Sequence, residues 1–149
     1  MEAVIQDVEK VMRNAKNNAE KMNKEADLAF NEAAAIRTTA NERLQFTKEA
    51  LDKSTEDVTT SFDEWLKINQ TYQADQTIEN WLANEEAKAK YVKIRTISMN
   101  DKKLYRQAKE HSDDVGYLTE NAAENARLAS CAFEAACISY TRITGLLFL

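Results

Sequence analysis

Apolar residues recur along the first part of the chain with steps that alternate between four and three. The members of this first stripe are Val8, Met12, Ala15, Ala19, Met22, Ala26, Ala29, Ala33, Ile36 and Ala40. Such spacing is the heptad repeat by which one α-helix packs along another. Beyond Ile36 the pattern continues through Thr55 to Tyr72 with extra steps of four, and such steps predict a local change toward an eleven-residue, or hendecad, repeat.

The pattern predicts one outgoing helical arm over residues 2–73, which at ~1.5 Å per residue spans roughly 105 Å. A second interpretation stays open at residues 37–43. There Thr38 and Thr39 are β-branched, and Asn41 could cap a new helix. A break at this place would give a compact four-helix bundle.

A turn is predicted at about residues 73–77, where Thr77 can cap the helix that follows. The return arm covers about residues 78–147, and we expect breaks in it near residues 98–103 and 111–116. A second heptad stripe follows the second break. Its members are Val115, Leu118, Ala122, Ala126, Ala129, Phe133, Ala136, Tyr140, Ile143 and Leu147.

The two arms have similar lengths, so folding at the turn places residue i across from about residue 148 − i. Small residues then meet small ones, with Ala122 and Ala129 across from Ala26 and Ala19. Trp81 falls beside Trp65 and Ile68. We therefore expect an all-α fold, either a long antiparallel helical hairpin or an elongated four-helix bundle with alanine-rich stripes, in a single domain of residues 1–149.

Composition agrees with a helical fold. Proline is absent and glycine occurs twice, whereas sheet proteins need turn residues every few positions. No leader segment is expected at the start, and the apolar stretch 128–149 is interrupted by Glu134 and Arg142, so we expect no stable membrane insertion and a cytoplasmic location. Cys131 and Cys137 point in different directions on a helix, which favours reduced thiols.

Charge divides the chain. Residues 87–109 hold eight basic residues and one acidic residue, and they fall across from about residues 39–61. The overlapping stretch 49–64 holds six acidic residues and one basic residue. Complementary charges on the two arms would define the register of the arms, but they would add little stability. Tyr91 and Tyr105 interleave with the basic residues as in some nucleic-acid surfaces. The net charge of −5 argues against nucleic acid as a partner.

Chemical motifs are scarce. A di-iron bundle needs Glu-x-x-His pairs, but His111 is the single histidine and Ala108 precedes it by three. Two cysteines and one histidine do not provide the spacing of a zinc site, and the chain lacks a glycine-rich phosphate loop. We expect no enzyme, no metal and no cofactor, with His111 in solvent near a helix end.

The first stripe is flanked by further apolar residues such as Ile5, Leu28 and Phe46, and a width of this kind calls for more helices than a hairpin supplies. Gly145 can end the last helix, which leaves four apolar residues to bury in the chain's own core or in a neighbour. The aromatic residues near the turn, Phe62, Trp65, Tyr72 and Trp81, either belong to the core of the bundle or form an exposed patch that docks a partner.

These features predict a self-assembling structural protein that builds a homo-oligomer or filament. The alternative is an adaptor that binds a helix of another protein, and a reversible lipid-binding bundle is disfavoured because lipid-inserting faces prefer larger residues than alanine. The residues assigned to assembly are Ala19, Ala26, Ala33, Ala122, Ala129, Phe133, Trp65, Trp81, Lys90, Lys93, Arg95, Leu146, Leu147, Phe148 and Leu149.

Overall fold

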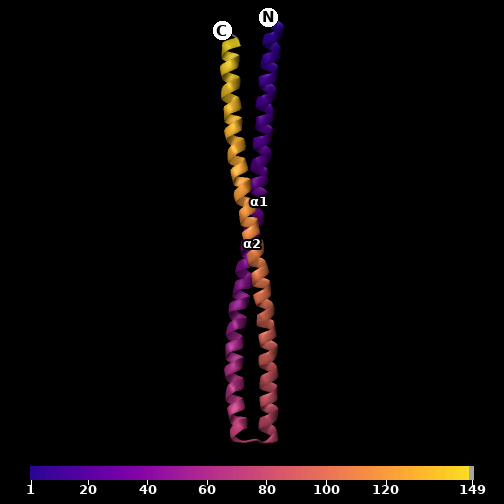
Figure 1. Cartoon of the computed structure of the whole chain (residues 1–149), viewed down its shortest axis with the longest axis vertical. Coiled ribbons are helices and arrows are strands. Elements are labelled where there is room, and N and C mark those ends of the chain that lie inside the picture. The colour runs from indigo at the N-terminus through magenta and orange to yellow at the C-terminus, as the bar shows by residue number, and fades with distance from the viewer. Residues whose placement is uncertain (148–149) are drawn as a thin grey trace. The chain divides into compact units, whose positions relative to one another are not determined.

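Two long α-helices make up the computed structural model, which describes residues 1–147 and the side chains of residues 1–146. Helix α1 comprises Glu2–Ala74 and helix α2 comprises Ile78–Leu147, and the described residues contain no strand. Figure 1 traces both helices and the turn that joins them. The prediction of an all-α fold is confirmed, and the two helices pack against each other as a hairpin requires.

Helix α1 continues without a break through residues 37–43, the place at which a helix break is the second interpretation of the sequence. The Thr38 hydroxyl donates to the carbonyl oxygen of Ala34 at 3.1 Å, so this β-branched residue is accommodated within the helix. Asn41 does not cap a new helix, since its Oδ1 accepts a hydrogen bond from Ser112 at 2.8 Å. The structure therefore gives no support to a compact bundle built from a broken first arm.

Helix α2 is also continuous, so the breaks predicted near residues 98–103 and 111–116 are wrong. Gly116 and Gly145 both lie inside the helix, and no described glycine has a positive φ. Potential capping residues do not end a helix when the packing face continues past them and no proline interrupts the backbone. His111 is exposed, as expected, but it lies in the middle of α2 rather than near an end.

The turn forms where the sequence predicts it. Thr77 caps α2, because its hydroxyl oxygen accepts a hydrogen bond from the backbone N–H of Asn80 at 3.1 Å. The side-chain amide of Asn80 also donates to the carbonyl oxygen of Asp75 at 2.7 Å. These two contacts satisfy backbone groups that the ends of α1 and α2 leave free.

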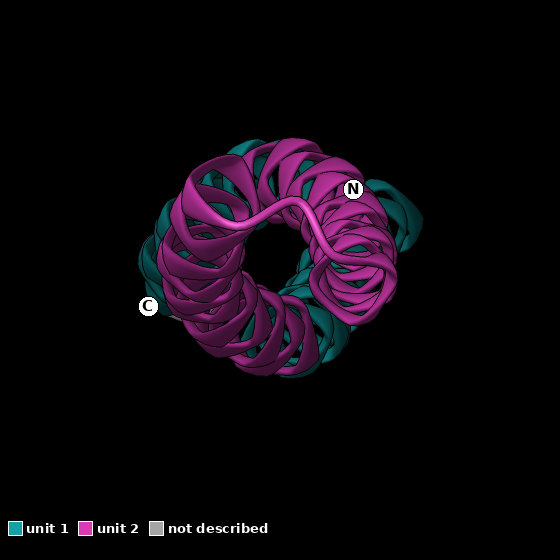
Figure 2. Ribbon diagram, turned by 90° about the horizontal axis from the view of Figure 1, so that it is seen from below, with its two compact units in different colours: residues 1–38, 114–149 teal, residues 39–113 magenta. Residues whose placement is uncertain are grey.

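The chain divides into two compact units, coloured separately in Figure 2. Unit 1 comprises residues 1–38 and 114–149, and unit 2 comprises residues 39–113. Each unit therefore contains one segment of α1 and one segment of α2. The unit boundaries fall at the two places, near residues 38 and 113, where the sequence suggests helix breaks.

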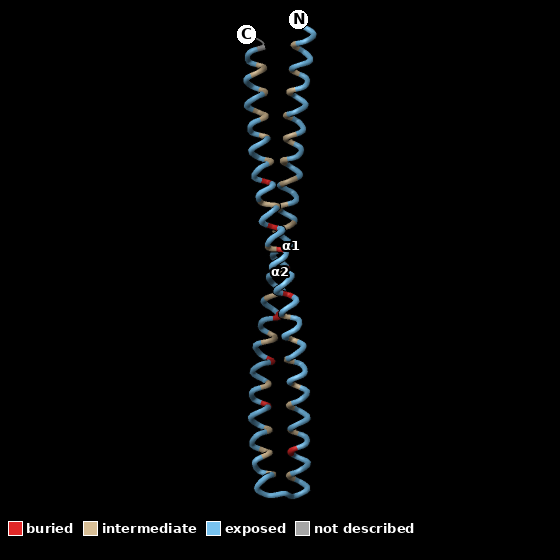
Figure 3. Tube along the Cα trace, viewed as in Figure 1, coloured by how far each residue is buried: buried red, intermediate tan, exposed pale blue. Residues whose placement is uncertain are grey.

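Burial defines an inner face on each helix (Figure 3). On α1 the buried or half-buried positions alternate by four and three from Ile5 to Tyr72, with Arg37 alone exposed at a position of this spacing. They include Ile5, Glu9, Met12, Lys16, Ala19, Asn23, Ala26, Phe30, Ala33, Ala40, Leu44, Thr47, Leu51, Ser54, Val58, Ser61, Trp65, Ile68 and Tyr72. The predicted extra steps are wrong: Ser54 and Ser61 face inward, whereas Thr55 and Phe62 are exposed.

The inner face of α2 has the same spacing from Asn80 to Ile143. Its members are Asn80, Asn84, Ala87, Tyr91, Ile94, Ser98, Asp101, Tyr105, Ala108, Ser112, Val115, Thr119, Ala122, Ala126, Ala129, Phe133, Ala136, Tyr140 and Ile143. Eight of the ten residues of the predicted second stripe lie on this inner face. Leu147 continues the same spacing, but its side chain is not among those described. The exception is Leu118, which is 62% exposed while the neighbouring Thr119 is 5% exposed.

Contacts between the helices fix the register in each unit. In unit 1 Ala33 meets Thr119 and Glu9 meets Tyr140, and in unit 2 Asn41 meets Ser112 and Glu64 meets Lys90. Residue i therefore lies across from about residue 152 − i, roughly one helical turn from the predicted value.

The corrected register changes which side chains oppose each other. Phe133 rather than Ala129 lies across from Ala19, and Ala122 lies across from Phe30. At these two places a large residue opposes a small one, contrary to the prediction, whereas Ala26 still lies across from a small residue, Ala126. A pair of helices fills its interface in this way because a large side chain needs space on the facing helix.

The hairpin has a thin core. The buried apolar residues among those described are Ala40, Ala108, Val115 and Ala126, and no large side chain is fully buried. The other buried side chains, Thr47, Ser54, Ser61, Asn84 and Thr119, are polar. All four of their hydroxyls donate to carbonyl oxygens of the preceding helical turn, so these side chains fill space without leaving a hydroxyl unpaired.

Candidate functional site

The described residues hold no group of three His, Cys, Asp or Glu side chains that could bind a metal ion. Cys131 is exposed, Cys137 is half-buried, and neither forms a disulfide. The exposed surface is more informative, because large apolar side chains are abundant there and scarce inside.

One side of unit 1 carries an uncharged row on each helix. The residues of these rows come directly before every second position of the inner-face repeat. In an antiparallel pair of helices, residues at this heptad position lie on the same side of the pair. We call this surface the apolar flank. It consists of Val8, Ala15, Met22, Ala29 and Ile36 on α1, and of Leu118, Asn125, Ala132, Ser139 and Leu146 on α2.

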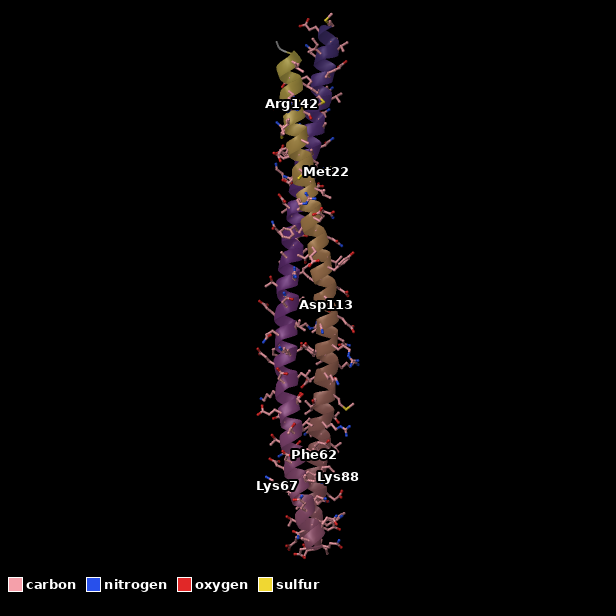
Figure 4. All side chains as sticks on the ribbon, turned by 60° about the vertical axis from the view of Figure 1, so that its left-hand side comes forward. Met22, Phe62, Lys67, Lys88, Asp113 and Arg142 are labelled. Carbon is pink, nitrogen blue, oxygen red and sulfur yellow. The ribbon has the colours of Figure 1, made fainter. Side chains whose placement is uncertain are left out.

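The large side chains of the apolar flank are open to solvent. Met22, labelled in Figure 4, is 64% exposed, Ile36 is 54% exposed and Leu118 is 62% exposed. Val8 belongs to a groove at the start of α1 that Val4, Val11 and Met12 also line. Contiguous apolar exposure is a common feature of surfaces by which proteins bind other molecules.

The inner face next to the apolar flank is partly polar. Glu9 forms an ion pair with Arg13 and accepts a hydrogen bond from the Tyr140 hydroxyl at 3.3 Å. The Lys16 Nζ lies 5.1 Å from the centroid of the same Tyr140 ring. Asn23 is less well accommodated, because its Oδ1 is buried with no hydrogen-bond partner in the described structure.

The first predicted stripe therefore divides between two surfaces. Met12, Ala19, Ala26, Ala33 and Ala40 lie on the inner face, whereas its other members lie on the apolar flank. Because α1 packs against a single helix, only half of this apolar stripe is covered by α2. This division locates the assigned residues Ala19, Ala26 and Ala33 inside the hairpin, together with Ala122, Ala129 and Phe133 of α2.

Aromatic residues gather in unit 2 around Trp65. Its ring stacks on Tyr91 with centroids 5.4 Å apart, and Phe62 contacts both rings. Trp81 is 46% exposed and takes no part in these ring contacts, so the expected neighbour of Trp65 is replaced by Tyr91. The difference follows from the register, since a shift of one turn brings a different α2 residue to Trp65.

Most charged side chains of the basic segment, residues 87–109, form no ion pair in the described structure. Lys90 pairs with Glu64 at 2.9 Å, the one ion pair between α1 and α2 among the described residues. Lys93 and Arg95 are exposed and form no ion pair there. The predicted facing of basic and acidic segments is thus present in unit 2 at one contact.

Two carboxyl groups of unit 1 are held by neighbours on their own helix. A hydrogen bond from Lys24 lowers the pKa of Glu20, and one from Arg127 lowers the pKa of Glu124. Both pairs are exposed and stay within one helix, so they leave the relation between α1 and α2 unaffected.

The end of the chain differs from its prediction in one respect. Gly145 does not end α2, which runs to Leu147. Leu146 is 72% exposed and belongs to the apolar flank. Phe148 and Leu149 lie outside the described residues.

No described helix is long and apolar enough to cross a membrane. Comparisons of the chain with models of known protein families, with curated proteins and with solved structures found no match.

Proposed function

We propose that this chain is a self-assembling structural protein in which the apolar flank of unit 1 packs against the apolar flank of a second copy. The observation that carries this proposal is the flank itself: the same heptad position is uncharged in five consecutive heptads of each helix, and its large apolar side chains are exposed. Two hairpins joined there form a four-helix bundle with the apolar residues inside.

The surface of the single chain supports the proposal. Its accessible surface is 11091 Å² for a mass of 17.0 kDa. A compact monomer of this mass exposes about 7,700 Å². The excess is on the order of 3,000 Å² for each copy, and a permanent interface buries about 2,000–5,000 Å² summed over both partners, so one copy has surface enough for its share of such an interface.

The sizes of the flank residues also suit a second copy. Ala15 and Ala29 alternate with the large residues Val8, Met22 and Ile36 of α1. Large side chains of one copy can fill the spaces above alanines of the other, as Phe133 does across from Ala19 inside the hairpin. Alanine also lets helix axes approach to the low end of the ~8–10 Å range.

Burial of the flank is large enough to drive association. Each large apolar side chain contributes roughly 1.5–3 kcal/mol when fully buried. A two-fold contact doubles the number of such side chains, because the same surface is used on both copies. Their sum is comparable to the roughly 4–15 kcal/mol that association costs in lost motion. Growth into a filament needs a further contact, for which the apolar end at residues 146–149 is a candidate.

An adaptor that binds a helix of another protein is the second candidate function. The same flank would accept an amphipathic helix in the groove between α1 and α2. An adaptor remains a monomer at all concentrations without its partner, whereas a self-assembling protein does not.

Sedimentation equilibrium over a range of concentrations tests the proposal. We expect wild type to associate, and the variant Met22→Lys/Ile36→Lys to stay a monomer with unchanged helix content by circular dichroism. The matched control is Leu28→Lys/Leu128→Lys, which adds the same charge at exposed leucines outside the flank. A wild type that is monomeric at every concentration, or a control that dissociates as fully as the flank variant, contradicts the proposal.

A further inference from the structure

Four basic residues of α2 form a straight row in unit 2. Lys88, Arg95, Lys102 and Lys109 are spaced by seven residues, and all four are exposed. Each follows an inner-face position by one residue, so the row lies at one side of the contact between α1 and α2. Figure 4 shows the start of the row at Lys88, near the level of Phe62 on α1. Successive charges are about 10.5 Å apart along the helix.

Four acidic residues of α1 form a row with the same spacing. Glu42, Glu49, Glu56 and Asp63 are exposed, and each follows the inner-face residues Ala40, Thr47, Ser54 and Ser61 by two positions. Residues at this place in the heptad repeat lie on the side of α1 that is turned away from α2. Lys53 stands beside this row but forms no ion pair with it in the described structure.

The two rows occupy the same levels of unit 2. By the register of about 152 − i, Glu42 lies level with Lys109 and Asp63 lies level with Lys88, and the two middle pairs match in the same way. The rows cannot meet within one chain, because they are on different sides of it. Among the described residues, none of these eight side chains forms an ion pair.

We propose that the basic row of one copy binds the acidic row of a second copy. This inference rests on the proposed self-assembly and adds a second contact with a defined register. Because α1 and α2 run in opposite directions, two copies placed side by side in the same orientation bring Glu42 to Lys109 and Asp63 to Lys88 without an axial shift.

This contact uses different surfaces on the two copies, so it differs from the two-fold contact of the apolar flank. Each copy that has bound a neighbour by its basic row still presents a free acidic row. A contact of this type continues from copy to copy and produces a ring or a filament. Residues of unit 2 therefore give the assembly its growth and its register, while unit 1 supplies the apolar contact.

An acidic helix of the same chain fits the basic row better than nucleic acid does. The acidic row matches it in number, spacing and level, and the chain has a net charge of −5, which opposes binding to a phosphate backbone. Binding of duplex DNA is thus an alternative outcome that the test must separate.

The test uses a pair of complementary charge reversals. One variant is Lys88→Glu/Arg95→Glu/Lys102→Glu/Lys109→Glu, and the other is Glu42→Lys/Glu49→Lys/Glu56→Lys/Asp63→Lys. Each alone presents two rows of like charge, so we expect each to associate roughly tenfold to a hundredfold more weakly than wild type. Mixed in equal amounts they should co-assemble, as measured by sedimentation velocity and by energy transfer between differently labelled variants.

The matched control is Lys53→Glu/Lys67→Glu/Lys93→Glu/Lys103→Glu, which changes the net charge equally outside the basic row. We expect it to associate nearly as wild type does. The milder pair Arg95→Glu/Lys102→Glu and Glu49→Lys/Glu56→Lys repeats the test if a fourfold variant loses helix content. Association of wild type should also weaken as salt is raised, since exposed charges are screened.

Three results overturn the inference. The first is association of the reversed variants equal to that of wild type, and the second is a mixture of the two variants that shows no recovery. The third is wild type that binds a fluorescent DNA duplex through the basic row while reversal of this row leaves self-association unchanged. The proposed function fails in a different way, by a wild type that is monomeric at every concentration.

Discussion

The indole Nε1 of Trp65 donates a hydrogen bond to Oδ1 of Asn84 at 3.1 Å, which joins α1 to α2 in unit 2. Asn84 is 8% exposed, and the Trp65 ring stacks on Tyr91 one heptad further along α2. Trp65 is thus held between two residues of the facing helix, which fixes the register near the turn.

Replacing Asn84 should destabilise the hairpin. Asn84→Ala leaves the indole N–H without its acceptor, and an unsatisfied buried donor costs about 1–3 kcal/mol. The melting temperature should fall by roughly 2–4 °C for each kcal/mol in a chain of this size. Asn100→Ala, at an exposed position of α2, is the control. Equal melting temperatures for Asn84→Ala and wild type would show that this bond adds nothing.

A second prediction separates the inner face from the apolar flank. Ala126 is 9% exposed on the inner face, so Ala126→Leu should overpack the hairpin and lower its stability by about 1–3 kcal/mol. Ala29 lies on the flank, where Ala29→Leu should leave stability of the monomer nearly unchanged in urea unfolding. A larger loss for Ala29→Leu than for Ala126→Leu would mean that the assignment of the two surfaces is reversed.

Asn23 gives a third prediction, because its buried Oδ1 lacks a partner. Asn23→Leu removes an unsatisfied polar atom from the inner face and should raise the melting temperature of unassembled protein. A buried asparagine often favours one register at a cost in stability. A lower melting temperature in Asn23→Leu would indicate that the amide is satisfied in solution.

The pair of Glu124 and Arg127 gives a prediction about pH. The hydrogen bond from Arg127 lowers the pKa of Glu124, so the stability that this pair contributes is present above the usual pKa of a glutamate. It is lost as pH falls through the lowered value. Carboxyl titration by NMR should show Glu124 ionising at lower pH than in the variant Arg127→Gln. Identical titration curves in the two proteins would show that the pair does not form.

The sequence was informative about helices because their signals are local. The lack of proline, the scarcity of glycine and the spacing of apolar residues were enough for the two arms and for the cap at Thr77. Candidate breaks such as Asn100 and Gly116 misled, because a capping residue is also tolerated inside a helix whose packing continues.

The register and the facing residues needed the structure. A search for apolar spacing assigns Val8 and Met22 to the packed face of α1. In the hairpin the polar residues Glu9, Lys16 and Asn23 face α2 at these levels. Polar residues gave no sign of facing inward, since their partners, such as Tyr140 for Lys16, come from the distant return arm. The disagreement is itself informative, because an apolar stripe that the hairpin does not cover is what a second copy would bury.

Thiol accessibility at Met22 tests the central claim most directly. In a background with Cys131→Ser and Cys137→Ser, the variants Met22→Cys and Leu28→Cys place one thiol on the apolar flank and one outside it. The rate of alkylation is measured as protein concentration rises. Association through the flank predicts that alkylation at position 22 slows severalfold while the rate at position 28 stays constant. Equal rates at both positions across the whole concentration range, in a sample that sedimentation shows to be associated, would contradict the account.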